Sequence, residues 1–71
     1  MKKLKVKLKA LRINAEMSQQ EAAERLGVTE KTLQNWENYV TYPNAVQLVS
    51  ICNLYGCELD DIFLPDALAL S

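Results

Sequence analysis

Residues 29–38 carry a concentrated group of hydrogen-bonding side chains. At about 100° per residue, a helix here turns Leu33, Trp36 and Val40 toward its inner side. The outer side carries Lys31, Asn35 and Asn38, with Thr32 and Gln34 at its flanks. An ordinary solvated helix face more often carries Glu and Lys pairs. These amide, hydroxyl and ammonium groups supply donors and acceptors with little charge, which is the chemistry needed to contact the edges of DNA bases.

Other chemistries lack the residues that they need. The sequence contains no histidine, so the common zinc sites have no complete ligand set. Cys52 and Cys57 show no metal-binding pattern, and we expect both to be small buried hydrophobic residues without a disulfide. Asp60 and Asp61 are adjacent and diverge on a helix, where the helix dipole explains them better. With no glycine-rich phosphate loop and no second domain, the sequence argues against an enzyme and predicts no metal, cofactor or small-molecule ligand.

Two short helices joined by a tight turn must hold the polar face in place. We expect them over residues 19–26 and 30–38. Ser18 is a good cap for the first helix, and Glu21, three residues later, completes a capping box. Gly27 ends this helix, because glycine adopts the left-handed conformation at little cost.

The turn between these helices is too short for them to lie antiparallel, so they must cross. Ala23 is small enough to lie at the crossing, Val28 is apolar within the turn, and Thr29 caps the second helix. Together with Leu33 and Trp36, this spacing indicates a helix-turn-helix unit. A plain helical hairpin with no role in DNA binding is the alternative interpretation.

The positively charged residues are concentrated at the N-terminal end of the chain. A net charge of −1 counts against a general nucleic-acid binder, but six of the eight cations precede all nine acids. These six are Lys2, Lys3, Lys5, Lys7, Lys9 and Arg12. Only this basic end suits phosphates, although its lysines could equally serve to keep the first helix soluble.

Length and composition indicate one domain over residues 1–71, with a core at about 5–64 and a short tail at 65–71. A chain of this size buries only about 60% of its unfolded surface, so it needs tight packing or oligomerisation. No apolar run approaches the ~20 residues of a membrane span. Lysines interrupt the first residues, which argues against a secretory leader and for a cytoplasmic protein.

Helical periodicity predicts three further helices, which makes the fold all-α with five helices. The first covers about residues 5–15, where Leu4 and Leu8 begin an apolar stripe. The alternation around Val6 also permits a strand, but the longer helical series favours a helix. A fourth helix covers about 45–55, with Asn44 as its cap and Gly56 at its end. The fifth begins near Glu58 and stops at Pro65.

The residues now assembled resemble the phage repressor/Cro-type helix-turn-helix family, often called the XRE family. The resemblance covers about residues 8–62. The shared pattern consists of Leu8, Leu11, Arg12, Ser18, Gln19, Glu21, Ala23, Leu26, Gly27, Val28, Leu33, Trp36, Glu37, Pro43, Leu48, Gly56, Leu59 and Ile62. It implies a lambda-repressor-like domain that binds double-stranded DNA sequence-specifically, regulates transcription and usually forms a homodimer.

The resemblance also implies roles for particular residues. Base edges would be contacted by Glu30, Lys31, Thr32, Gln34 and Asn35. Phosphates would be bound by Gln19, Thr29 and Asn38, joined by Lys5 and Lys9 of the basic end. The dimer would use the apolar residues Ile62, Phe63, Leu64, Leu68 and Leu70. We expect two copies on a pseudo-palindromic operator, each with residues 30–38 in the major groove, most simply as a repressor.

Arg12 and Glu37 occupy positions that often form an ion pair between the first and third helices of this family. A phosphate contact of Arg12 is the alternative. Where the family often has glycine and then a basic residue, this chain has Tyr39 and Val40. Tyrosine is strained in the left-handed conformation, so we expect the helix to continue or Asn38 to adopt that conformation. Val40 removes a phosphate contact, which lowers the expected affinity for DNA.

A function in protein binding is the second hypothesis. The acidic later part of the chain and its apolar tail also suit an antitoxin or another partner in a phage regulatory system. A neighbouring toxin-like reading frame, or co-purification with a basic protein, would favour this hypothesis over DNA regulation.

Overall fold

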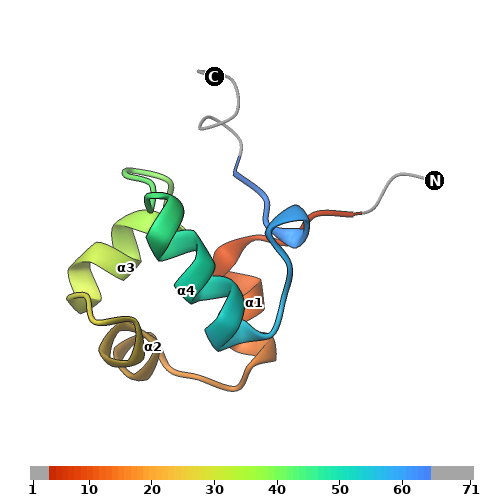
Figure 1. Ribbon diagram of the computed structural model, residues 1–71. Coiled ribbons are helices and arrows are strands. Elements are labelled where there is room, and N and C mark those ends of the chain that lie inside the picture. The colour runs from red at the N-terminus through yellow and green to blue at the C-terminus, as the bar shows by residue number, and fades with distance from the viewer. Residues whose placement is uncertain (1–3, 65–71) are drawn as a thin grey trace.

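The computed structural model describes residues 4–64. Within them the chain forms α1 (Leu8–Asn14), α2 (Gln19–Leu26), α3 (Glu30–Glu37), α4 (Ala45–Tyr55) and the 3₁₀ helix η1 (Leu59–Asp61). Helix α2 packs on both α3 and α4, and α1 packs on α3 (Figure 1). The predicted all-α fold is confirmed, and the bounds expected for α2, α3 and α4 agree with the structure to within one residue.

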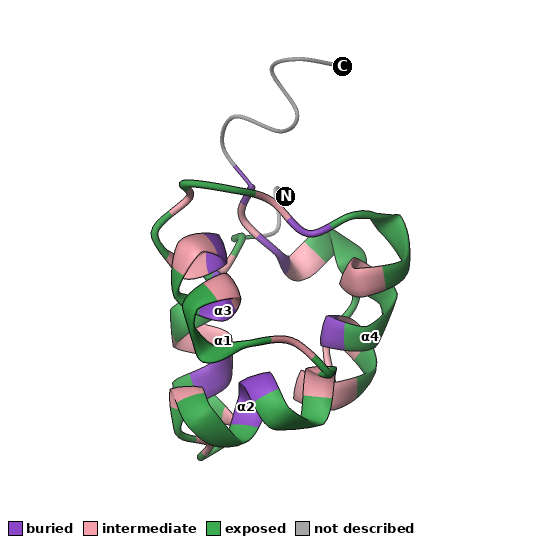
Figure 2. Cartoon of the chain, turned by 90° about the vertical axis from the view of Figure 1, so that its left-hand side faces the viewer, coloured by how far each residue is buried: buried purple, intermediate pink, exposed green. Residues whose placement is uncertain are grey.

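The core lies where the four α-helices face one another. Ala22 and Ala23 of α2 are 0% and 2% exposed, and their small side chains let α2 approach its neighbours closely. Figure 2 shows buried positions on the inward sides of the helices and exposed positions around the outside. The other buried hydrophobic residues are Leu8, Leu33, Trp36, Ile51, Ile62 and Leu64.

The first helix begins later than predicted, because the chain before it is extended. The Val6 amide donates to the Asp61 carbonyl at 2.7 Å, and the Phe63 amide donates to the Val6 carbonyl at 3.0 Å. This short parallel bridge satisfies backbone groups that a helical turn would otherwise have used. Leu4, which the prediction placed in the core stripe, is 89% exposed. The strand-like alternation was therefore the correct local signal.

The predicted fifth α-helix is instead one 3₁₀ turn, η1. Residues 62–64 are needed in an extended conformation, because they pair with Val6 and bury Ile62 and Leu64 in the core. A continued helix would turn these side chains in different directions. Of the two adjacent acids, Asp61 has a capping role, since its carboxylate accepts from the Glu58 amide at 2.8 Å.

Each of the four α-helices is followed by a residue in the left-handed conformation. Gly27 and Gly56 have φ of 72° and 69°, as their residue type predicted. Glu16 and Tyr39 adopt φ of 59° and 60° without that freedom. The ends of α1 and α3 agree with the prediction to within one residue, but the left-handed conformation of Glu16 and Tyr39 was not predicted, because glycine was the main sequence signal for it.

Neither of the two alternatives expected after α3 occurs: the helix does not continue, and Tyr39 is left-handed, whereas Asn38 has a φ of −93°. The Tyr39 amide donates to the Trp36 carbonyl at 3.2 Å, and the Val40 amide donates to the Asn35 carbonyl at 2.9 Å. This pair of bonds is a Schellman motif, which satisfies the last carbonyls of a helix. The chain therefore turns away directly after α3. Val40, predicted to face inward, is 68% exposed.

Side-chain contacts hold Tyr39 in this strained conformation. Its ring meets the Phe63 ring edge-on with centroids 6.1 Å apart, and the Tyr42 ring lies at 6.3 Å. The Tyr39 hydroxyl donates to the Phe63 carbonyl at 3.3 Å. These contacts offset a backbone strain of about 1–2 kcal/mol.

Replacing Tyr39 with glycine or alanine should separate the strain from the ring contacts. Both variants lose the ring, so both should unfold more easily than the wild type. Tyr39→Gly should nevertheless be more stable than Tyr39→Ala by about 1 kcal/mol, because glycine adopts positive φ without strain. Urea unfolding measures both free energies. A more stable alanine variant, the order found inside helices, would contradict the left-handed Tyr39.

Candidate nucleic-acid interface

Side-chain caps define where α2 and α3 begin. The Ser18 hydroxyl accepts from the Glu21 amide at 3.0 Å, as predicted. A full capping box would also have the Glu21 carboxylate accept from the Ser18 amide. This carboxylate instead lies 3.4 Å from Arg25, with which it forms an ion pair. The Thr29 hydroxyl accepts from the Thr32 amide at 3.1 Å, which confirms Thr29 as the cap of α3. Local sequence thus positions the first turn of each helix.

The outer side of α3 is free of contacts that would bury it against the described chain. Leu33 and Trp36 are 1% and 3% exposed, so they anchor the opposite side as predicted. The exposed side consists of Glu30, Lys31, Gln34 and Asn38. We call these four residues the exposed α3 face.

Two predicted base-contacting residues lie beside this face rather than on it. Thr32 and Asn35 are half-buried, whereas Gln34, predicted at a flank, is exposed at the centre. The Thr32 hydroxyl also forms a hydrogen bond with the Thr29 hydroxyl at 2.8 Å. Both threonine hydroxyls therefore serve the start of α3.

A buried ion pair joins α1 to α3. Arg12 Nε donates to Glu37 Oε2 at 2.7 Å, and Arg12 Nη2 donates to Glu37 Oε1 at 3.2 Å. The third donor, Arg12 Nη1, bonds the Met17 carbonyl at 3.0 Å. Gln19 Nε2, from α2, donates to Glu37 Oε1 at 3.1 Å. The ion pair expected from the sequence is present, and these three helices meet at it.

The guanidinium of Arg12 is committed to this network. Only 11% of the Arg12 side chain and 3% of the Glu37 side chain are exposed. The hydrogen bonds to Glu37 raise the pKa of Arg12 further above its ordinary value, so the charge persists. The alternative of a phosphate contact is therefore not supported, because this cation is already paired within the fold.

Lys5 is also occupied within the fold. Its Nζ donates to the Asp60 carbonyl at 3.1 Å, which ties the segment before α1 to η1. Figure 1 places that segment and the first turn of α3 on opposite sides of the molecule. The structure thus does not bring Lys5 to the exposed α3 face, contrary to the predicted phosphate site. Lys9 is exposed on α1.

The predicted dimer surface requires correction. Ile62 and Leu64 are 2% and 8% exposed, so they belong to the chain's own core and present no surface to a second copy. Phe63 is half-buried against Tyr39. Leu68 and Leu70 lie outside the described residues.

A buried hydroxyl in α4 was not anticipated from the sequence. The Oη of Tyr55 is buried and has no hydrogen-bond partner within residues 4–64. Burial, reinforced by the nearby Glu37 carboxylate, raises the pKa of Tyr55 to about 12. No sequence pattern marks such a group, because its environment comes from other helices.

The two cysteines were expected to be buried, and they are half-buried free thiols. Burial, with Cys52 close by, raises the pKa of Cys57 to about 11. At neutral pH the Cys57 thiol therefore stays protonated, which agrees with the predicted role as a hydrophobic residue.

Comparison with known proteins adds the decisive observation. A family model described as helix-turn-helix matches residues 8–62, most of the chain. The chain belongs to the XRE/Cro-type helix-turn-helix family. It is a DNA-binding transcription regulator of that type. No curated protein and no solved structure gives a significant match. Within the described part of the chain, no helix has the length and apolar character to cross a membrane.

Removing one partner of the Arg12–Glu37 pair should destabilise this XRE-type domain strongly. Glu37→Gln preserves size but leaves a buried guanidinium without its counter-charge, so the free energy of unfolding should fall by about 3 kcal/mol. Glu21→Gln is the matched control, because the Glu21–Arg25 pair is exposed and is worth about 0.5 kcal/mol. Urea unfolding compares them, and equal losses would refute a special role for the buried pair.

Tyr55→Phe should stabilise the protein by about 1 kcal/mol at neutral pH, because it removes an unpaired buried hydroxyl. It should also reduce the sensitivity to alkali. The folded state holds the Tyr55 proton to about pH 12, whereas the unfolded chain releases it near 10. Wild-type stability therefore falls as the pH rises through this interval. Thermal unfolding of the wild type and of Tyr55→Phe at pH 7 and pH 11 measures both effects. An equal loss of stability in the two proteins between these pH values would contradict the raised pKa of Tyr55.

Proposed function

We propose that this protein is a repressor that binds a pseudo-palindromic operator as a homodimer, with α3 of each copy in the major groove. The supporting observation is the exposed α3 face, which presents polar groups while Leu33 and Trp36 hold the opposite side. Two such helices fit successive major grooves when their centres lie one turn apart, at about 34 Å.

The proposed base contacts centre on Gln34. Its amide can donate to and accept from adenine, and Lys31 can donate to guanine. Glu30 can accept from the amine of cytosine, although the start of α3 also favours its charge. Asn35 and Thr32 would contact the groove from the sides of α3. Each good pair would discriminate by about 1–3 kcal/mol.

The proposed phosphate contacts use helix N-termini more than cations. The first turns of α2 and α4 direct backbone N–H groups outward, a geometry that suits phosphate oxygens. Gln19 would contribute from the start of α2, while Thr29, Asn38 and Lys9 remain proposed contacts. Within residues 4–64, Arg12 is buried in an ion pair and Lys5 is held by η1, so the fold already uses two of the cations of the basic end. We infer that two linked half-sites supply the necessary affinity.

Repression follows from where such a dimer would sit. A dimer on a promoter occupies the DNA that RNA polymerase needs, so binding alone is sufficient to block transcription. No additional surface is required for that effect, whereas an activator must also contact polymerase. Reporter expression with the operator placed over a promoter separates the two roles.

Selection of DNA fragments by the purified protein tests the proposal. The wild type should enrich a pseudo-palindrome with half-sites about 10 base pairs apart. Gln34→Ala should alter the preferred base at one position of each half-site. Asn53→Ala is the control, because Asn53 is an exposed amide on α4, outside the exposed α3 face. This variant should enrich the same DNA sequence as the wild-type protein.

Two other outcomes would count against the proposal. If Gln34→Ala weakened binding equally for all DNA sequences, Gln34 would not contact bases. An absence of any enriched sequence would reject operator binding and favour the protein-binding hypothesis.

A further inference from the structure

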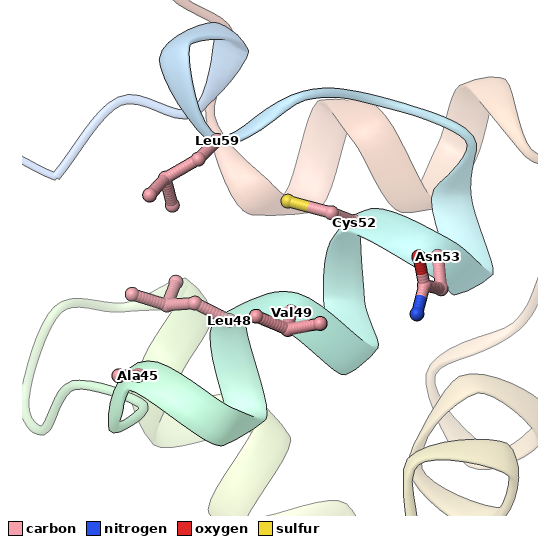
Figure 3. Close-up of a pocket in the computed structure, with 6 residues that line it drawn as sticks. All are labelled: Ala45, Leu48, Val49, Cys52, Asn53 and Leu59. Atoms are coloured by element: carbon pink, nitrogen blue, oxygen red, sulfur yellow. The ribbon is translucent and has the colours of Figure 1, made fainter.

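An apolar groove lies between α4 and η1, and none of the residues that line it belongs to the exposed α3 face. Its volume is about 310 Å³. Its lining consists of Ala45, Leu48, Val49, Cys52, Asn53 and Leu59 (Figure 3). Val49 and Leu59 remain 59% and 56% exposed, so the described chain leaves much of this apolar surface in water.

Helix α4 differs from the other α-helices in having no charged residue among its eleven positions. Its hydrophobic residues extend around the helix, yet Ile51 alone is fully buried and Val46 is 75% exposed. A helix that is apolar on all sides is normally covered on more than one side. An apolar, uncharged segment would therefore be the best match for the side of α4 that lines the groove.

We propose that residues 66–71 of the same chain occupy this groove, with the side chains of Leu68 and Leu70 inside it. The segment starts close enough to reach. Leu64, the last described residue, follows groove-lining Leu59 by only five positions, or about 17 Å at full extension. Leu68 and Leu70 lie four and six residues beyond Leu64, so they can reach about 13 and 20 Å from it, and the reach of Leu70 exceeds the largest possible separation of Leu64 from Leu59. Pro65 suits the turn that brings the segment back.

The segment matches the groove in chemistry and size. Leu68 and Leu70 are two positions apart, so an extended backbone directs both toward the same side, with Ala67 and Ala69 opposite. The groove has about twice the volume of a ~150 Å³ cavity that holds benzene, which accommodates two leucine side chains. Asp66 precedes both leucines, so the pair can enter without burying a charge.

Attachment through Leu64 favours the chain's own segment over that of a second copy. A short tether holds the segment at an effective concentration in the millimolar range, far above ordinary solution concentrations of the protein. Coverage of the groove should therefore be the same in dilute and concentrated samples.

The thiol of Cys52 can report occupancy of the groove, because it belongs to the lining. Cys57 is first replaced with alanine in the full chain, so that Cys52 is the remaining thiol. Mass spectrometry then follows the rate at which iodoacetamide alkylates Cys52. The double substitution Leu68→Asp and Leu70→Asp should raise this rate about tenfold, as expected for a groove covered about nine-tenths of the time. The matched control, Ala67→Asp and Ala69→Asp, adds the same charge to the opposite side and should leave the rate within about twofold.

Two results would overturn the proposal. Equal rates in the leucine and alanine variants would show that the leucines do not cover Cys52. Protection that increases with protein concentration would assign the groove to a second copy instead of the chain's own segment. Unchanged circular dichroism in both variants confirms that neither rate reflects unfolding.

Discussion

The contact between Arg12, Glu37 and Gln19 determines how α3 is held against the rest of the domain. Glu37 ends α3, Arg12 lies in the last turn of α1, and Gln19 begins α2. A buried ion pair adds little net stability, because desolvation of both charges nearly cancels their attraction. Its hydrogen bonds are directional, and each of the three helices supplies one of the three side chains that form them. The orientation of the exposed α3 face depends on this arrangement.

The same network limits what the domain can offer to DNA. The first twelve residues hold most of the cations, but the fold uses Arg12 for an ion pair and Lys5 for a carbonyl of η1. Arg25, beside α3 in the sequence, pairs with Glu21. Within residues 4–64, these three cations are therefore held by contacts of the fold itself, which is why the proposed DNA contacts rely on helix N-termini, amide groups and two copies.

Tight helix ends maintain the crossing of the helices. Every α-helix is followed by a left-handed residue, which reverses the chain within one or two positions. Glycine does this without strain after α2 and α4, whereas after α3 Tyr39 is held in this conformation by contacts with Tyr42 and Phe63. The end of α3 is consequently coupled to Phe63. The bridge from Val6 to residues 61–63 closes the domain at the same place.

Local signals were enough to determine α2, α3 and α4. Ser18, Thr29 and Asn44 cap their own helices, and a cap acts within three residues of chain. The polar outer side of α3 was also predicted from local sequence, because the periodicity of a helix decides which residues share a side. The contacts of this side with DNA remain predictions. The Arg12–Glu37 pair was expected from the family resemblance. Only the tertiary structure decided the start of α1, the shortness of η1, the conformation of Tyr39 and the burial of Ile62 and Leu64. Each of these depends on contacts between segments 24 to 57 positions apart in the sequence, such as Tyr39 with Phe63 and Val6 with Phe63, and no local pattern encodes such a pairing.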